Sequence, residues 1–128
     1  MGDNLAATIL VVDDEEPVRA LLARLLAPEN HTVIGASTAD EALRIVEQER
    51  VDLILLDLHM PGDYDGEQLL YLLRDRGDNV PIIVVSGWVD DEATVNRPDC
   101  VHAVLKKPID RLTLLQTVRD ALATPYEP

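Results

Sequence analysis

Acidic residues end two of the apolar segments in this 128-residue chain, and their spacing could place them in one site. Asp13 and Asp14 follow the apolar run at residues 8–12, and Asp57 follows the run at 53–56. Both runs have the length and composition of buried β-strands. Because the carboxyl ends of neighbouring parallel strands share one edge of a sheet, we expect the three carboxyl groups to meet there.

Carboxylates gathered in this way need a cation or a bound proton between them. Two of them about 4 Å apart repel by about 4 kcal/mol at an effective dielectric constant of 20. One would therefore stay protonated unless a cation lies between them. Magnesium prefers oxygen ligands and typically takes one or two carboxylates together with phosphate oxygens. The acidic residues therefore predict a Mg²⁺ site that could receive a phosphoryl group.

Two further polar residues end apolar runs and are expected at the same edge. Ser86 follows the run at residues 82–85, and Lys107 follows closely after the run at 101–105. If the strands lie in the order 2-1-3-4-5, both residues converge with the acids on one rim of the sheet.

The apolar runs alternate with segments whose apolar residues recur at helical spacing, which is typical of repeated βα units. The expected strands are Thr8–Val12, Thr32–Ala36, Leu53–Leu56, Ile82–Val85 and Val101–Leu105. All but the second are apolar nearly throughout, as strands covered on both faces should be. The pattern predicts an α/β protein of the flavodoxin-like, doubly wound class, with a five-stranded parallel sheet of order 2-1-3-4-5 and helices on both faces.

Four of the intervening segments predict clear helices. Pro17 suits the first turn of one that contains Leu22 and Leu26. Thr38 and Glu41 form a capping-box pattern that opens the second. The third contains residues 69–73, and the last runs over about 110–123. The segment at 87–100 contains a proline that disfavours helix, so we expect a short fourth helix there.

The strong negative charge of the chain disfavours some classes of binding partner. The chain has 24 acidic and 11 basic residues, a formal net charge of −13, and such a surface repels nucleic-acid phosphates and anionic lipids. The single Cys100 has no partner for an intrachain disulfide, and no segment resembles a signal peptide or a membrane span. We expect one cytoplasmic domain over residues 1–128, with its core at about 8–123 and frayed ends, that binds neither nucleic acid nor membrane.

The ordered set of polar motifs resembles the receiver domain of two-component response regulators, and the resemblance covers about residues 8–123. It rests on Asp13-Asp14, Asp57, Met60-Pro61-Gly62, Asp65-Gly66, Ser86-Gly87 and Lys107-Pro108. Each motif is common alone, but the order and the strand ends are specific to this family. The resemblance implies that Asp57 is the phosphoacceptor. It also implies that Asp13, Asp14 and Asp57, together with the backbone carbonyl of His59, hold Mg²⁺.

The resemblance further implies that Ser86 and Lys107 contact phosphoryl oxygens. The expected donor is a sensor histidine kinase or a histidine phosphotransfer domain. Such a protein is a signalling domain that catalyses only its own phosphorylation and dephosphorylation, and is not a conventional enzyme. With no effector attached, it would signal by docking to a protein target, or it would pass the phosphoryl group on in a phosphorelay.

The sequence departs from the family pattern where receivers transmit their signal. Val104 occupies the fifth-strand position that is commonly aromatic, and Ile109 replaces the usual Phe after Lys107-Pro108. The loop at 61–66 is one residue longer than the common form. The predicted chemistry is therefore intact, while the signalling face differs.

Other functional classes fit less well. A receiver-like interaction module that never uses phosphate remains the main alternative, and magnesium binding would separate the two. A phosphatase with an aspartyl nucleophile would need a second acid two residues after Asp57, where His59 stands. A flavin or nucleotide carrier would need a loop rich in Gly, Ser or Thr at residues 13–16, where four acids stand instead.

Overall fold

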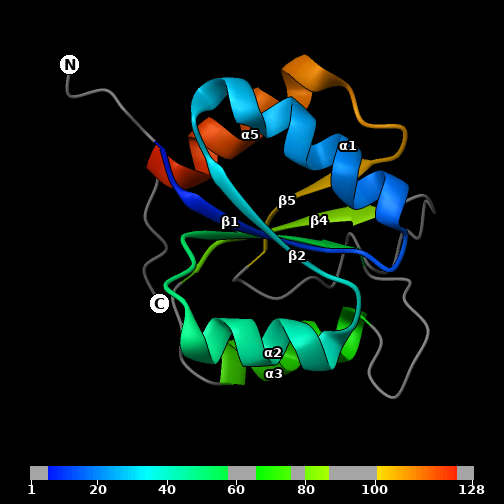
Figure 1. The fold of residues 1–128 in the computed structure, drawn as a ribbon, viewed down its shortest axis with the longest axis vertical. Helices are drawn as coiled ribbons and strands as arrows, with labels where there is room; N and C mark the ends of the chain where they lie inside the picture. Colours follow the sequence, from blue (N-terminus) through cyan, green and yellow to red (C-terminus); the bar gives the residue numbers. More distant parts are fainter. Residues whose placement is uncertain (1–5, 58–65, 76–79, 87–100, 124–128) are drawn as a thin grey trace.

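The five strands form one parallel sheet in the order β2-β1-β3-β4-β5 (Figure 1). The computed structural model describes residues 6–57, 66–75, 80–86 and 101–123. Its strands are β1 (Thr8–Val12), β2 (Thr32–Ala36), β3 (Leu53–Asp57), β4 (Ile82–Ser86) and β5 (Val101–Lys106). The predicted fold class and strand order are confirmed.

Helices cover both faces of the sheet. They are α1 (Glu16–Leu26), the 3₁₀ helix η1 (Ala27–Glu29), α2 (Ala39–Gln48), α3 (Gly66–Asp75) and α5 (Arg111–Ala123). In Figure 1, α1 and α5 lie on one side of the sheet, and α2 and α3 lie on the other. The expected short fourth helix falls at residues 87–100, which lie outside the described residues.

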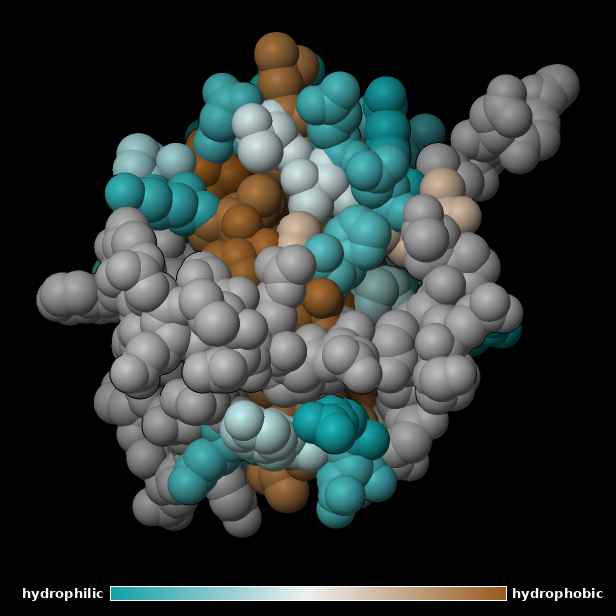
Figure 2. Space-filling view, turned by 180° about the vertical axis from the view of Figure 1, so that it is seen from behind, coloured by the Kyte–Doolittle hydropathy of each residue, from teal (hydrophilic) through white to brown (hydrophobic). Residues whose placement is uncertain are grey.

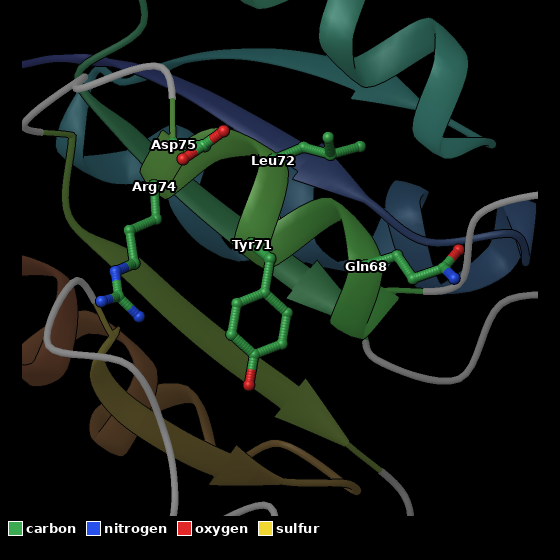
Figure 3. Close-up of a pocket in the computed structure, with 5 residues that line it drawn as sticks. All are labelled: Gln68, Tyr71, Leu72, Arg74 and Asp75. Atoms are coloured by element: carbon green, nitrogen blue, oxygen red, sulfur yellow. The ribbon is translucent and has the colours of Figure 1, made fainter.

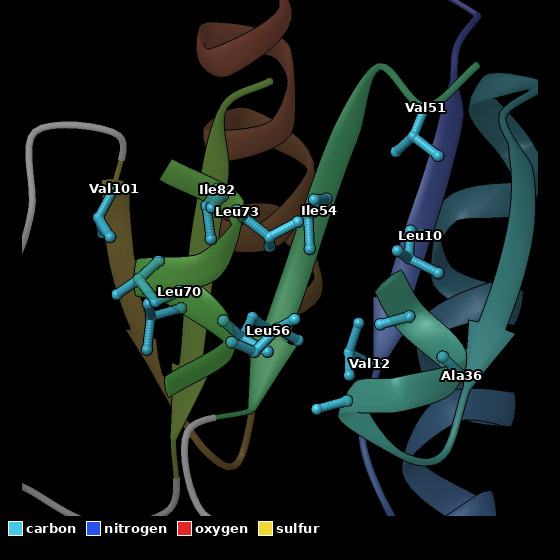
Figure 4. Packing of buried hydrophobic residues seen from close by; sticks show 14 residues of the cluster. Leu10, Val12, Ala36, Val51, Ile54, Leu56, Leu70, Leu73, Ile82 and Val101 are labelled. Atoms are coloured by element: carbon cyan, nitrogen blue, oxygen red, sulfur yellow. The ribbon is translucent and has the colours of Figure 1, made fainter. Parts of the chain in front are cut away.

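Alternate residues of the central strands pack on opposite faces, because successive side chains of a strand point to opposite sides. Leu10 and Leu56 belong to the hydrophobic cluster under α2 and α3 (Figure 4). Ile9 and Leu55 belong to the cluster under α1 and α5. All five residues of β3 are buried, which explains why this strand reads as an almost continuous apolar run.

Three strands, β3, β4 and β5, extend one residue further than predicted. Asp57 is the last residue of β3, where it pairs with Val85, and Ser86 is the last residue of β4, where it pairs with Lys106. These polar residues remain in the sheet because each has a residue of a neighbouring strand to pair with. Their backbones are therefore held by the sheet rather than by a loop.

The predicted capping box of α2 is present with one difference. The Thr38 hydroxyl accepts a hydrogen bond from the Glu41 N–H at 3.1 Å. The Glu41 carboxylate accepts from the Ser37 N–H at 2.7 Å, one residue earlier than the usual arrangement. Thr38 and Glu41 thus fix the point at which the chain leaves β2 and enters α2.

Most of the large apolar side chains among the described residues are buried. The exposed exceptions are Leu21, Tyr71, Leu72 and Leu112. Seen from behind, the surface shows hydrophobic areas bordered by hydrophilic side chains (Figure 2). In the part of the chain that the structure describes, no helix has both the length and the hydropathy needed to span a membrane.

Candidate functional site

The register of the sheet brings Asp13 and Asp57 side by side. Val12 pairs with Leu56, so the next residue of each chain segment lies at the same edge of the sheet. The Asp13 N–H donates to the carbonyl of Ala36 at 3.0 Å, which extends the hydrogen bonding between the first two strands by one residue. Asp13 is 1% exposed and Asp57 is 4% exposed, so both carboxyl groups are buried in the protein.

Lys107 supplies the positive charge between these two acids. Its Nζ lies 3.0 Å from Oδ2 of Asp13 and 3.6 Å from Oδ2 of Asp57. The contact with Asp13 is also a hydrogen bond. The Lys107 side chain is 21% exposed, so it is only partly enclosed by the protein. The predicted convergence of Asp13, Asp57 and Lys107 at one rim is therefore observed.

The same contacts determine the charge state of Lys107. Partial burial acts to lower the Lys107 pKa, because it disfavours the charged ammonium. The hydrogen bond that Lys107 donates to Asp13 and the attraction of the Asp57 carboxylate act in the opposite direction and outweigh burial, so the pKa of Lys107 is raised above its ordinary value of 10.5. The ammonium is consequently charged throughout the neutral pH range.

Asp14 completes a cluster whose composition fits a hard divalent cation. Asp13, Asp14 and Asp57 each offer a carboxylate oxygen, and these oxygens lie within 4.8 Å of one another. Carboxylate oxygens are ligands that Mg²⁺ prefers. Asp14 is exposed, which leaves the cluster open to solvent on one side. Phosphate oxygens could approach a cation bound at this cluster from the open side.

The loop that carries Asp13 and Asp14 is held by further hydrogen bonds. Oδ1 of Asp13 accepts from the Glu15 N–H at 2.9 Å, a contact that stabilises the turn into α1. The guanidinium of Arg19 donates to the backbone carbonyl of Asp13 at 2.6 Å. Sequence reasoning did not identify Arg19. In the sequence, Arg19 is only a basic residue that follows several acidic ones near the start of a helix. That pattern does not show that its side chain contacts the backbone of Asp13.

The structure places the other predicted site residues only in part. The backbone of Ser86 ends β4, one position beyond the residue that pairs with Asp57, but its side chain lies outside the described part of the structure. His59 lies wholly outside the described residues. Val104 and Ile109, at positions where the family commonly has aromatic residues, are half-buried and pack against opposite core clusters.

A separate hollow lies along the outer face of α3 (Figure 3). Its volume is about 540 Å³, and it is lined by Gln68, Tyr71, Leu72, Arg74 and Asp75. Tyr71 and Arg74 point to the same side of the helix (Figure 3). None of the three clustered aspartates lines this hollow, and the residues that do line it are exposed. The buried charges at the carboxyl edge of the sheet are therefore the stronger candidate for chemistry.

Comparison with known proteins is consistent with this arrangement. Residues 9–119 match the model of the response regulator receiver domain family. The chain belongs to this family. A receiver domain from Methanospirillum hungatei has a TM-score of 0.84 and 28% identity, and the match covers 92% of this chain and 94% of that one.

Longer proteins also contain a segment similar to this receiver domain. The transcriptional regulatory protein GlrR of Escherichia coli is 33% identical over 118 residues, which are 91% of this chain and 26% of that protein. The sensor kinase CckA of Brucella abortus is 37% identical over 120 residues, 91% of this chain and 13% of that protein. NtrX of Brucella abortus, a solved structure, has a TM-score of 0.85 and 32% identity, with coverage of 92% and 27%.

The receiver domain thus spans about a quarter of GlrR and less of CckA. Receiver domains of response regulators are signalling domains that interact with histidine kinases, and they are not conventional enzymes. The predicted resemblance is confirmed at the level of the family and the fold.

Proposed function

We propose that this receiver domain is a phosphorylation-dependent switch in which Asp57 accepts a phosphoryl group from a phosphohistidine. The observation that carries the proposal is the position of Asp57 itself. Its carboxyl group is buried at the end of β3, 3.6 Å from the Lys107 ammonium and within the same cluster as Asp13 and Asp14. A buried carboxylate with a cation beside it and an open acidic cluster around it suits attack on a phosphorus atom.

The transfer step can be written for these residues. A carboxylate oxygen of Asp57 forms a bond to phosphorus while the P–N bond of the phosphohistidine breaks, and the bonding electron pair leaves with the imidazole nitrogen. Lys107 stabilises negative charge on a phosphoryl oxygen, and the Ser86 hydroxyl donates a hydrogen bond to another. Later attack of water on phosphorus releases inorganic phosphate and restores the Asp57 carboxylate.

A magnesium ion would be held by the carboxylates of Asp13, Asp14 and Asp57 and the backbone carbonyl of His59. When bound, it supplies positive charge to the equatorial phosphoryl oxygens. Asp13 has a second task, because its Oδ2 accepts a hydrogen bond from Lys107 and so holds the ammonium close to Asp57. Asp14 is the exposed member of the cluster, and Asp57 is buried beside it.

The proposed partners are proteins. A sensor histidine kinase or a histidine phosphotransfer domain would donate the phosphoryl group in the cytoplasm, and a downstream protein would recognise the phosphorylated form or take the group in a phosphorelay. The formal charge of −13 favours neither nucleic acid nor an anionic membrane as a direct partner of this domain.

Intact-protein mass spectrometry tests the proposal. The protein is incubated with phosphoramidate, whose P–N bond resembles that of phosphohistidine, with Mg²⁺ or with a chelator. We expect one phosphoryl group on the wild type and on Asp52→Asn, a change at the opposite end of β3, and none on Asp57→Asn or without Mg²⁺. Equal labelling of Asp57→Asn would refute the assignment, and no binding of Mg²⁺ would favour the phosphate-independent interaction module.

A further inference from the structure

Arg19 connects three elements next to the acidic cluster. It lies in the first turns of α1, and its Nη1 donates to the Asp13 carbonyl oxygen at 2.6 Å. Its aliphatic stem passes beside Gly35 of β2, where a Cβ atom on Gly35 would stand at a van der Waals distance of 3.4 Å from the Arg19 Cδ. The Arg19 stem therefore packs beside β2 on its way to the β1–α1 turn.

The hydrogen bond from Arg19 fixes a peptide plane. The carbonyl of Asp13 and the N–H of Asp14 belong to one planar peptide unit, so holding the carbonyl oxygen also orients the bond that leads to Asp14. The Asp14 side chain is exposed, and none of the described residues donates a hydrogen bond to its carboxylate. The backbone at Asp14 therefore contributes to placing this carboxylate within 4.8 Å of the other two.

We propose that Arg19 is a positioning residue for the divalent cation, acting through the Asp13–Asp14 peptide plane on the carboxylate of Asp14. The inference rests on the proposed function, in which these carboxylates hold Mg²⁺. Without the Arg19 donor, the Asp13 carbonyl can turn toward water, and Asp14 moves away from Asp13 and Asp57. Partners that orient metal ligands in this way typically contribute about 10- to 100-fold to metal affinity.

The sign of the effect separates this role from a simple charge effect. A guanidinium near a cation site repels the cation, so removal of its charge alone would strengthen Mg²⁺ binding. Loss of a positioning contact weakens binding instead. A weaker affinity after removal of a positive charge therefore has no explanation in Coulomb's law.

The test is isothermal titration calorimetry with MgCl₂ on the full chain. Arg19→Met keeps the apolar stem over Gly35 and removes the donor, and we expect the dissociation constant for Mg²⁺ to rise about tenfold. Arg19→Lys restores a donor and should recover part of the affinity. Arg24→Met removes the same charge from an exposed position on the same helix, and its dissociation constant should stay within about twofold of the wild type.

A double mutant locates the effect at Asp14. If Arg19 acts through Asp14, then Arg19→Met should have little further effect in a protein that already carries Asp14→Asn. Thermal unfolding of each variant without Mg²⁺ shows whether the fold is retained, and Arg19→Leu, which also lacks the donor, serves if the methionine variant does not fold.

The inference and the proposed function fail in different ways. Wild-type affinity or tighter binding in Arg19→Met would overturn the inference while leaving the proposed function standing, as would additive losses in the double mutant. Absence of Mg²⁺ binding to the wild type would overturn both.

Discussion

Removing the ammonium of Lys107 should destabilise the protein in a way that Mg²⁺ repairs. Lys107→Met leaves Asp13 and Asp57 buried without their cation, although the methionine keeps most of the side-chain volume. At an effective dielectric constant of 20, the ammonium attracts each carboxylate by about 5 kcal/mol at these distances. The loss cannot reach the sum of both, because removing the ammonium also removes the desolvation cost of burying it.

Water also moderates the effect, since the Lys107 side chain is 21% exposed. Breaking a buried ion pair by removing one partner costs about 3–5 kcal/mol, and we expect about 3 kcal/mol here. For a chain of this length, that loss lowers Tm by about 10–15 °C. Lys106→Met is the matched control: this neighbouring lysine is exposed, and we expect its removal to change the free energy of unfolding by less than about 0.5 kcal/mol.

Chemical and thermal unfolding, followed by circular dichroism at neutral pH with a chelator, measure these differences. Added Mg²⁺ should raise the Tm of Lys107→Met by more than it raises that of the wild type, because the ion replaces the missing charge. Equal stabilities of Lys107→Met and Lys106→Met in the chelator would refute the electrostatic account of the site. If Mg²⁺ raised the Tm of Lys107→Met by no more than it raises that of the wild type, the claim that Mg²⁺ and the Lys107 ammonium act on the same carboxylates would be refuted.

Three further predictions concern the scaffold. Thr38→Ala removes the cap of α2 and should cost about 1 kcal/mol in chemical unfolding. Leu114→Ala opens a cavity under α5 and should cost about 2–5 kcal/mol by the same measurement; a loss below 1 kcal/mol would contradict its packing. Burial lowers the pKa of His31 below its usual 6.5, although Glu29 acts to raise it. The unfolded chain therefore binds the extra proton, and stability should fall as pH drops below about 6.5. His31→Asn should reduce this slope of stability against pH.

The sheet could be predicted from sequence because most of its strands are buried on both faces. Continuous apolar runs such as residues 53–56 mark the strands, and helical spacing marks the segments between them. The ends were less accurate. Asp57 and Ser86 belong to their strands, since a backbone ladder continues through a polar residue without any change in hydropathy at that point.

The 3₁₀ helix η1 was not predicted, although its signals are present in the sequence. Pro28 lies within it, and Asn30, at a φ of 66°, closes it in the left-handed region that asparagine tolerates better than most residues. Three residues are too few to show a helical period, so hydropathy alone does not detect such a turn.

The acidic cluster and Lys107 could be predicted because each residue type lies at a strand end and the strand order brings those ends together. Arg19 could not, because its partner is a backbone carbonyl, which every residue possesses. The altered capping of Ser37 by Glu41 was missed for the same reason. Residue types thus indicate where charges gather, whereas the contacts that orient the backbone around them require coordinates.

The most direct test of the central claim is to locate the phosphoryl group in the chain. After incubation with phosphoramidate and Mg²⁺, borohydride reduction marks the aspartate that carries an acyl phosphate, and tandem mass spectrometry of peptides identifies it. The account predicts reduction at Asp57 alone, and none when Mg²⁺ is chelated. Reduction at Asp13, Asp14 or any other acid, with Asp57 unmodified, would contradict it.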